Sequence, residues 1–341
     1  MLTLILSILL LKFNDSKIIV EPNSKDFHWP YIYSVDKPLK NNKKVYILIR
    51  SNNTGFPSND YEKIKEKTLE KYNRFNRRFK SLNVIYMTPI FPRIKNLHGS
   101  EYDFHSLERN TFELLQEKYV RIDNQLIGMV EDLKERLKKE HNIAVEDKVL
   151  LYGFSASGDF ADRFSLLHPE KVKAIVIGGC SVMIPAKVLK DENLPYPIGI
   201  YDLSMKIGVN FDSKAFFDLD RFIFKGSLDQ GGTWTVENGD QKKSYPWIEY
   251  ATKKYYAKFS NDTRFPVYSG RTLSNADLLL IKYRISNKSF NPINTFHEVK
   301  KVFAELGYSR NQFFEYAGVG HEVTDEIYSD IFDFLNQVIE M

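Results

Sequence analysis

Apolar and polar positions alternate along this chain in long blocks that predict a regular succession of strands and helices. Continuous apolar runs bounded by turn residues are typical of strands buried on both faces. Such strands are expected at Lys17–Val20, Tyr31–Val35, Lys44–Arg50, Asn83–Pro92, Val149–Tyr152, Ala174–Gly178, Arg221–Gly226 and Gln312–Tyr316. Apolar residues at helical spacing predict helices over Tyr61–Phe79, from Asp123, after Ser155, over Asn291–Leu306 and at the C-terminus. This alternation predicts an α/β fold, with a mostly parallel central sheet covered by helices on both faces.

The first residues differ from the rest of the chain. Leu2–Leu11 is apolar apart from Thr3 and Ser7, which suits the core of a signal peptide and is too short to span a membrane. No basic residue precedes this run, and no typical cleavage motif follows it. An export signal, a membrane-associated tail and a leader of uncertain start site all remain open. We expect residues 1–16 to be a hydrophobic leader, and we favour a secreted or membrane-associated protein over a cytoplasmic one.

Composition narrows the organisation and the class of protein. The 341 residues are 43% hydrophobic and 14% aromatic, which indicates a folded globular protein, long enough for one large domain or two modest ones. The sequence contains no internal repeat, low-complexity tract or long flexible linker, so we expect one domain over residues 17–341. The net charge is +4, but acids and bases are both abundant and no dense basic patch occurs, so nucleic-acid binding is not expected. No other stretch is apolar enough for a stable membrane span. Many aromatic residues fall between about 230 and 290, where we expect a cap-like insertion before the last helix–strand unit; ordinary core and surface aromatics are the alternative.

A short motif at the end of one strand carries the main chemical signal. After Val149–Tyr152 the chain reads Gly153-Phe154-Ser155-Ala156-Ser157-Gly158 and continues into a helical segment. A strand, a G-x-S-x-S-G turn and a helix form the pattern of a nucleophile elbow. Its serine lies where free helical N–H groups favour a developing negative charge. We predict Ser155 as the nucleophile, with Ser157 as a rival hydroxyl beyond the apex of the turn.

Two later residues follow strands of the same predicted sheet. Asp229 comes after Arg221–Gly226, and His321 lies in a glycine-rich loop after the last strand. In a parallel sheet the strand C-termini share one edge, so these loops can converge on Ser155. The order Ser, Asp, His along the chain is that of the α/β-hydrolase fold. His321 is predicted to be the general base and Asp229 the acid that orients it. The rivals for the acid are Asp220 and Asp240.

An oxyanion hole is also required for such a serine. The backbone N–H of Ala156 is expected to supply one donor, and Asn52 or Asn53, after the Lys44–Arg50 strand, the other. The histidines at 98 and 105 form no metal motif, and His105 is expected at the surface, with lining of the pocket as the alternative. Nucleotide-binding motifs are absent from the sequence. We therefore expect neither a metal nor a cofactor.

From about Lys44 to the C-terminus the chain resembles α/β-hydrolases. It is similar to bacterial hydrolases of the esterase and polyhydroxybutyrate-depolymerase-like group, many of which lack an assigned substrate. The resemblance is carried by Pro89–Arg93, Arg121–Ile127, Gly153–Asp162, Leu167–Val172 and Gly318–Glu322. It implies Ser155 as the nucleophile and His321 as the base, and it maps the acid onto Asp229 in a less distinctive context. One departure is the loop Ser51–Gly55, where many esterases have an H-G-G-G-like sequence.

These observations predict a serine hydrolase that acts on a small-molecule or polymeric carboxylic ester through an acyl-enzyme. An amidase or peptidase, or an acyltransferase, would use the same triad. A non-catalytic binding module on a hydrolase scaffold is a further alternative, because a fold does not fix a function. The sequence does not define the substrate or the oligomeric state.

Overall fold

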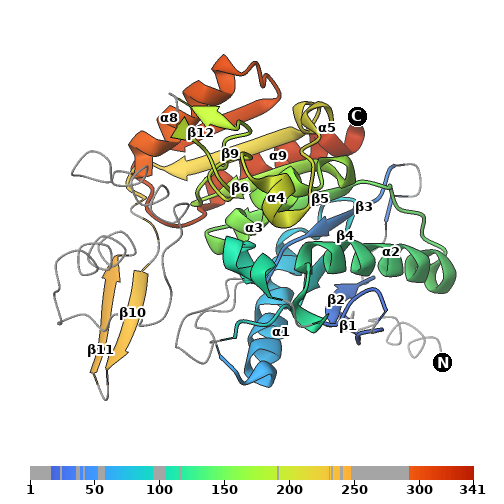
Figure 1. The fold of residues 1–341 in the computed structure, drawn as a ribbon. Coiled ribbons are helices and arrows are strands. Elements are labelled where there is room, and N and C mark those ends of the chain that lie inside the picture. The colour runs from blue at the N-terminus through green and yellow to red at the C-terminus, as the bar shows by residue number, and fades with distance from the viewer. Residues whose placement is uncertain are drawn as a thin grey trace, which may run out of the picture.

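The chain was studied as a computed structural model (Figure 1). It describes residues 17–23, 25–35, 39–40, 43–52, 58–94, 104–114, 117–189, 192–229, 231, 233–238, 241–246 and 292–341. The predicted leader, residues 1–16, lies outside the described residues. So does most of the predicted insertion.

One large sheet of eight strands forms the centre of the molecule. Its strands are β1 (Lys17–Val20), β2 (Tyr31–Ser34), β3 (Tyr46–Ile49), β4 (Val84–Pro89), β5 (Val149–Phe154), β6 (Val172–Gly178), β9 (Asp220–Gly226) and β12 (Asn311–Tyr316). They are ordered β1-β2-β4-β3-β5-β6-β9-β12 across the sheet. The pairs β1–β2 and β2–β4 are antiparallel, and every other neighbouring pair is parallel. The sheet is therefore mostly parallel, and β5 lies near its middle.

Helices cover both faces of this sheet because its central strands are apolar on both sides (Figure 1). One face packs against α1 (Tyr61–Arg78) and α9 (Asp325–Glu340), and the other against α2 (Ile122–His141), α3 (Ala156–Leu167) and α8 (Pro292–Glu305). Alternate residues of β5 enter the two cores: Leu150 packs towards α1 and α9, and Leu151 towards α2 and α3. A strand buried on both faces reads as a continuous apolar run, which explains why the sequence pattern predicted these strands.

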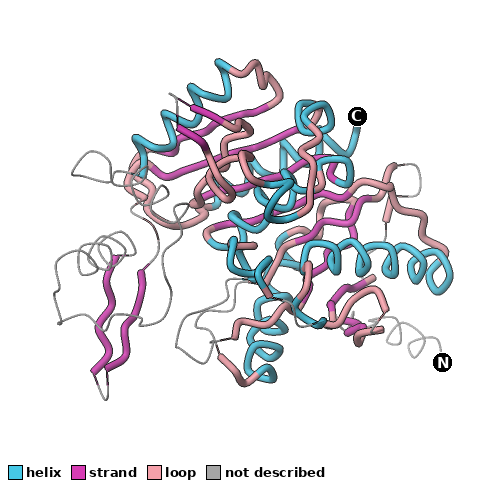
Figure 2. Tube along the Cα trace, viewed as in Figure 1, coloured by secondary structure: helices cyan, strands magenta, loops and turns pink. Residues whose placement is uncertain are grey.

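Short elements connect the main layers (Figure 2). They are the 3₁₀ helices η1 (Phe104–Ser106), η2 (Arg109–Glu113), η3 (Glu117–Tyr119) and η4 (Pro169–Lys171), the strands β7 (Val188–Leu189) and β8 (Glu192–Asn193), and the helices α4 (Leu203–Ile207) and α5 (Ser213–Phe217). The start of the predicted insertion forms an antiparallel hairpin of β10 (Thr233–Asn238) and β11 (Gln241–Pro246), which joins no strand of the large sheet. No helix in the described ranges is both long and apolar enough to cross a membrane.

Each long element of the predicted succession is present, with boundaries shifted by a few residues. Local capping explains two of these boundaries: Asp60 accepts a hydrogen bond from the N–H of Lys63 at the start of α1, and Thr324 accepts one from Ile327 at the start of α9. A mostly parallel sheet with helices on both faces, a serine elbow after a central strand and a hairpin before α8 make up an α/β-hydrolase fold. The predicted fold class is confirmed.

Candidate active site

Ser155 occupies a tight turn between β5 and α3. Its backbone has φ 59° and ψ −135°, in the region that side chains of L-residues rarely adopt. The turn is fixed by the N–H of Ser155, which donates to the carbonyl of Gly178 on β6 at 2.9 Å. A Cβ at Gly153 would lie 2.0 Å from the carbonyl oxygen of Ser157, so only glycine fits where the chain crosses itself. The predicted elbow geometry is therefore present.

Ser157, the rival hydroxyl, has a structural role in this turn. Its Oγ donates to the carbonyl of Phe154 at 2.8 Å and accepts from the N–H of Phe154 at 3.0 Å. The residue is fully buried. A hydroxyl used twice by the backbone is not available as a nucleophile, and the arrangement stiffens the elbow that holds Ser155.

The loops that carry Asp229 and His321 are joined to each other. After β9 and β12 end, the N–H of Leu228 donates to the carbonyl of Val319 at 2.9 Å. A Cβ at Gly226 would lie 2.2 Å from that same carbonyl oxygen, so the close approach of the two loops requires glycine there. The two loops are thus fixed relative to each other at the C-terminal edge of the sheet.

This connection brings the predicted acid and base into contact. The Nδ1 of His321 and the Oδ1 of Asp229 are 2.9 Å apart, and the N–H of Gly231 donates to the same Oδ1 at 2.7 Å. Asp229 is buried, while the side chain of His321 is 18% exposed. The rival Asp220 instead accepts two hydrogen bonds from Arg310, each 2.8 Å long. The other rival, Asp240, lies outside the described residues.

His321 also lies against the elbow. Its ring centroid is 4.7 Å from that of Phe154, the residue before Ser155. Its Cε1 would be 3.0 Å from a Cβ at Gly179, which follows the carbonyl that fixes Ser155. Within the described residues the Ser155 hydroxyl has no side-chain hydrogen bond. Nucleophile–base bonds are often long without substrate and shorten in the complex, so this arrangement is compatible with proton transfer.

Lys225 is a residue of this site that the sequence did not reveal. Its Nζ lies 3.8 Å from the Oδ2 of Asp229, and both side chains are buried. Burial raises the pKa of Asp229, but the hydrogen bond from His321 and the charge of Lys225 outweigh it and lower the pKa overall. Asp229 is therefore held ionised, as a group that stabilises an imidazolium must be. A lysine inside an apolar strand gave no signal of this contact.

The structure describes two of the three residues predicted to form the oxyanion hole, Ala156 and Asn52. Ala156 is the first residue of α3, and the first N–H groups of a helix have no intrahelical partner. The side chain of Asn52 is buried and bonds to Phe91 in both directions: its Nδ2 donates to the carbonyl at 2.8 Å, and its Oδ1 accepts from the N–H at 3.0 Å. That side chain is therefore engaged with Phe91, and the group of Asn52 that could serve as a donor is its backbone N–H. Asn53 lies outside the described residues.

His105 is not at the surface, so the sequence-based expectation was wrong. The residue is only 7% exposed, in the short helix η1 that packs against α3. Its Nδ1 is buried without a hydrogen-bond partner. Burial, and then the charges of Arg93 and Arg163, hold the pKa of His105 well below its usual value. A packed 3₁₀ turn leaves no periodic pattern, which is why the sequence could not show this burial.

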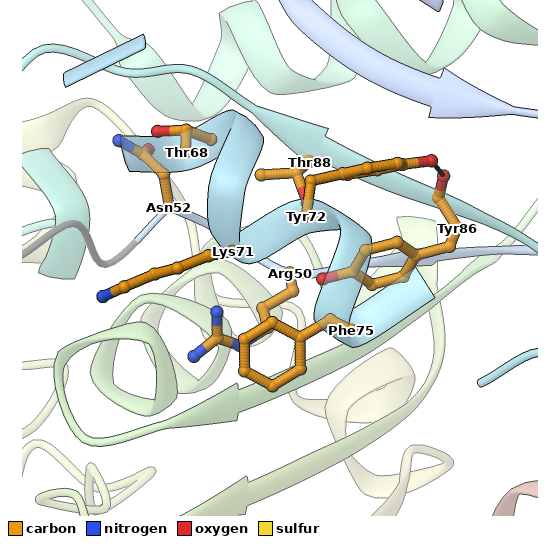
Figure 3. Close-up of a pocket in the computed structure, with 8 residues that line it drawn as sticks. All are labelled: Arg50, Asn52, Thr68, Lys71, Tyr72, Phe75, Tyr86 and Thr88. Carbon is orange, nitrogen blue, oxygen red and sulfur yellow. Dashed lines mark hydrogen bonds between the residues drawn. The ribbon is translucent and has the colours of Figure 1, made fainter. Parts of the chain in front are cut away.

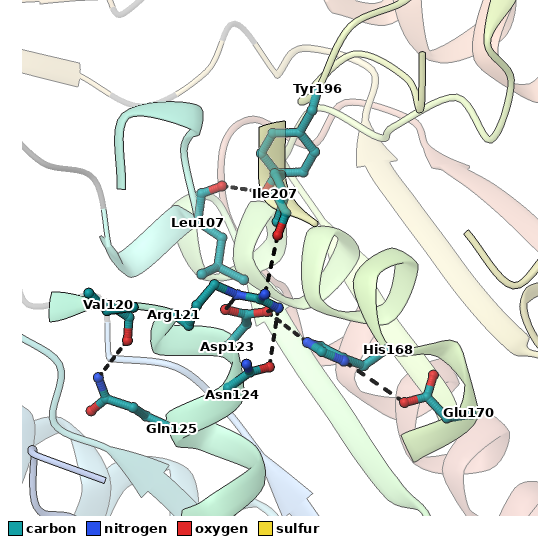
Figure 4. Close-up of polar contacts among 10 residues, drawn as sticks. All are labelled: Leu107, Val120, Arg121, Asp123, Asn124, Gln125, His168, Glu170, Tyr196 and Ile207. Atoms are coloured by element: carbon teal, nitrogen blue, oxygen red, sulfur yellow. Dashed lines mark hydrogen bonds and ion pairs between the residues drawn. The ribbon is translucent and has the colours of Figure 1, made fainter. Parts of the chain in front are cut away.

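A second His–Asp pair lies between α2 and the end of α3 (Figure 4). The Nε2 of His168 is 2.8 Å from the Oδ2 of Asp123, which is completely buried. Arg121 donates to both carboxylate oxygens of Asp123, at 2.9 and 2.6 Å. Burial raises the pKa of Asp123, but the bonds from His168 and Arg121 lower it overall. Two of the stretches that carry the family resemblance are therefore joined by one buried network.

In the described ranges no three His, Cys, Asp or Glu side chains are placed to hold a metal ion.

No protein-family model matches this sequence, and no curated protein matches it. Among solved structures, the chain is similar to a poly(aspartic acid) hydrolase from Sphingomonas sp. KT-1, with 13% identity, a TM-score of 0.47 and coverage of 95% of this chain and 97% of that one. It is similar to a siderophore hydrolase from Aspergillus nidulans, with 13% identity, a TM-score of 0.44 and coverage of 95% and 93%. A poly(3-hydroxybutyrate) depolymerase from Bordetella parapertussis has 13% identity, a TM-score of 0.44 and coverage of 89% and 83%.

These similar structures are hydrolases, the broad group that the sequence motifs resemble. The observations made on this chain itself are the strand order of the sheet, the strained turn at Ser155 and the paired loops of Asp229 and His321. Together they give this chain the α/β-hydrolase fold, with a serine, a histidine and an aspartate at one edge of its sheet.

Proposed function

We propose that the protein is a serine hydrolase that cleaves carboxylic esters through an acyl-enzyme. Ser155 is the nucleophile, His321 the general base and acid, and Asp229 the group that orients the imidazole. The bond between His321 Nδ1 and Asp229 Oδ1, beside the strained elbow, is the observation that supports this function most strongly. It leaves Nε2 as the ring nitrogen that can take the proton of a serine hydroxyl.

The reaction follows from these roles. Ser155 Oγ attacks the ester carbonyl carbon while Nε2 of His321 takes its proton, and a tetrahedral oxyanion forms. His321 then gives the proton to the departing alcohol oxygen, which leaves Ser155 acylated. Water attacks the acyl carbon in the second half, again deprotonated by His321, and the carboxylic acid and free Ser155 are released. Asp229 stays ionised throughout and stabilises the imidazolium.

The oxyanion needs two donors in fixed positions. We assign them to the backbone N–H of Ala156 and the backbone N–H of Asn52. The support for the second is indirect: the side chain of Asn52 is bonded twice to Phe91, which holds its backbone in place beside β5. Loss of one such donor removes about 3–4 kcal/mol of transition-state stabilisation.

Labelling with a fluorophosphonate probe and hydrolysis of p-nitrophenyl acetate test this function. The Ser155→Ala protein should lose both, because it lacks the hydroxyl proposed to form the acyl-enzyme. Ser165→Ala is the matched control: it removes a buried hydroxyl that bonds to Asp162 on the same helix, away from the turn. Retention of labelling in Ser155→Ala would contradict the assignment. Matched ester and amide substrates, compared by kcat/KM, separate an esterase from an amidase.

A further inference from the structure

A small cavity at the end of β3 contains a buried arginine. The cavity, here called the Arg50 pocket, has a volume of about 10 Å³, room for about one water-sized group, and lies between the ends of β3 and β4 and the helix α1. Its lining residues are Arg50, Asn52, Thr68, Lys71, Tyr72, Phe75, Tyr86 and Thr88. Figure 3 shows the polar ends of Arg50, Lys71 and Asn52 pointing to the same side of this pocket.

Arg50 differs from other buried arginines of the protein. Arg109 pairs with Asp202 at 2.6 Å, and Arg163 pairs with Glu108 at 2.8 Å. Arg50 is only 9% exposed, yet within the described ranges no carboxylate forms an ion pair with it, and the polar partner of its side chain is the hydroxyl of Tyr86. Burying a charge without a counter-ion is costly. The fold therefore holds a cation that a bound anion would stabilise.

Two aromatic rings stabilise the Arg50 cation, and further cations lie near it. The guanidinium Cζ lies 3.8 Å from the ring centroid of Phe75 and 5.9 Å from that of Tyr152, so two of its contacts are aromatic faces. Burial lowers the pKa of Lys71 to about 8, with further lowering by the charges of Arg50, Arg93 and Arg74. Several cations thus act on one small volume, which favours an anionic ligand.

The position of the pocket connects it with the candidate active site. Strand β3 pairs with β5 in parallel, with Ile49 beside Leu151, so Arg50 follows directly at the same edge of the sheet. Arg50 also contacts Tyr152, and Ser155 is three residues further along the same segment. At the rise of a strand, Tyr152 and Ser155 are roughly 10 Å apart along the chain. A substrate with an acyl chain of several carbons can span that distance.

We propose that the Arg50 pocket is a subsite for a carboxylate group of the substrate, so that the enzyme prefers esters whose acyl chain ends in a negative charge. The inference rests on the proposed role of Ser155. It adds a substrate class to that role: half-esters of dicarboxylic acids, or longer chains that carry carboxylates.

The test compares matched pairs of substrates. Mono-p-nitrophenyl esters of succinate, adipate and suberate have a free carboxylate, and their methyl esters have the same chain and leaving group without the charge. We expect a higher kcat/KM for the charged member at the chain length that fits. Arg50→Met, which keeps the apolar packing of the stem, should lower the charged-to-neutral ratio by roughly tenfold to hundredfold, as for a lost hydrogen bond to a charged group.

Arg77→Met is the matched control. Arg77 is exposed near the end of α1 and lines no part of the pocket, so removal of its charge should leave the ratio unchanged. All rates are measured at constant ionic strength, since long-range attraction depends on salt. An unchanged ratio in a folded Arg50→Met protein would overturn the subsite.

A second measurement does not depend on the folding of a variant. With the wild-type protein and a neutral ester as substrate, adipate should inhibit more strongly than adipamide, which has the same length without the charges. Equal inhibition contradicts the subsite. If no ester is hydrolysed and the fluorophosphonate probe does not label Ser155, the proposed function fails and the subsite fails with it; hydrolysis without a preference for charge contradicts the subsite alone.

Discussion

Two His–Asp pairs in this protein have nearly equal distances between the ring nitrogen and the carboxylate oxygen but different surroundings. His321 and Asp229 are 2.9 Å apart at the edge of the sheet, and His168 and Asp123 are 2.8 Å apart between two helices. His321 uses Nδ1 for the aspartate and lies beside the elbow of Ser155. His168 uses Nε2 for the aspartate, and its Nδ1 faces Glu170 at 3.9 Å.

The partners of the two aspartates explain this difference. Both oxygens of Asp123 are bonded by Arg121, and the carboxylate is completely buried, so the pair is a closed unit. One oxygen of Asp229 bonds to His321 and Gly231, while the other has the Lys225 ammonium at 3.8 Å and no hydrogen-bond partner among the described residues. A His–Asp contact alone therefore does not define a catalytic pair. The ring nitrogen that remains available, and what it faces, decide its role.

The largest expected difference is in catalysis. His321→Ala should lower kcat for p-nitrophenyl acetate by about 10⁴-fold or more, because it removes the only proposed base. His168→Ala should keep most of the activity of the folded protein. For each variant, the rate of p-nitrophenyl acetate hydrolysis is measured and divided by the fraction of the protein that is folded. Equal losses in two folded proteins would contradict the separation of the two pairs.

For stability, the His168–Asp123 pair should matter more than the His321–Asp229 pair. Asp123→Ala leaves Arg121 and His168 without their buried carboxylate, so the free energy of unfolding should fall by about 3–5 kcal/mol. Glu131→Ala is the control on the same helix: it breaks an exposed pair with Lys134, which contributes about 0–1 kcal/mol. Urea unfolding followed by circular dichroism measures both. A similar cost for the two variants would show that the buried network is not a structural unit.

A smaller effect should come from Lys225. Lys225→Met removes a cation that lowers the pKa of Asp229, so that pKa should rise and the acidic limb of kcat/KM should move to higher pH. Lys173→Met is a matched control, since Lys173 is also 3.8 Å from an aspartate, Asp220, that has no proposed catalytic role. The measurement is a pH–rate profile of each variant. The role of Lys225 is refuted if both profiles coincide with the wild type.

The smallest effect concerns stability in acid. The pKa of Asp123 is lower in the folded protein than its ordinary value, so its contribution to stability is present above about pH 4 and is lost as the pH falls through the lowered pKa. Asp123→Asn lacks this titration, and its free energy of unfolding should depend less steeply on pH in that range. Urea midpoints measured from about pH 5 downwards give the two slopes. Parallel slopes would contradict the predicted shift.

Much of this architecture could be predicted because it depends on local patterns. The strand before Ser155, the crossing point at Gly153 and the helix after it are adjacent in sequence, so one motif specified the elbow. The chain order of Ser155, Asp229 and His321 then suggested the triad. The fold is confirmed, the contact of Asp229 with His321 is present in the structure, and the catalytic roles remain proposals.

Other features could not be predicted because they join residues that are distant in sequence. His168 and Asp123 are 45 positions apart, and nothing in either stretch shows that they touch. His105 was expected at the surface, but it is buried because a short 3₁₀ turn packs against α3. The side chain of Asn52 is held by Phe91, a contact between residues 39 positions apart that the sequence did not show.

The sequence by itself determined the succession of strands and helices, since apolar periodicity is a local property that burial on one or two faces imposes on each segment. It also determined the elbow, because a tight strand-to-helix turn admits only small residues at the crossing. Only the tertiary structure decided which charges meet. His168 is placed against Asp123, His321 against Asp229, and Arg50 in a cavity without a carboxylate, by the packing of segments that come together only in the folded protein.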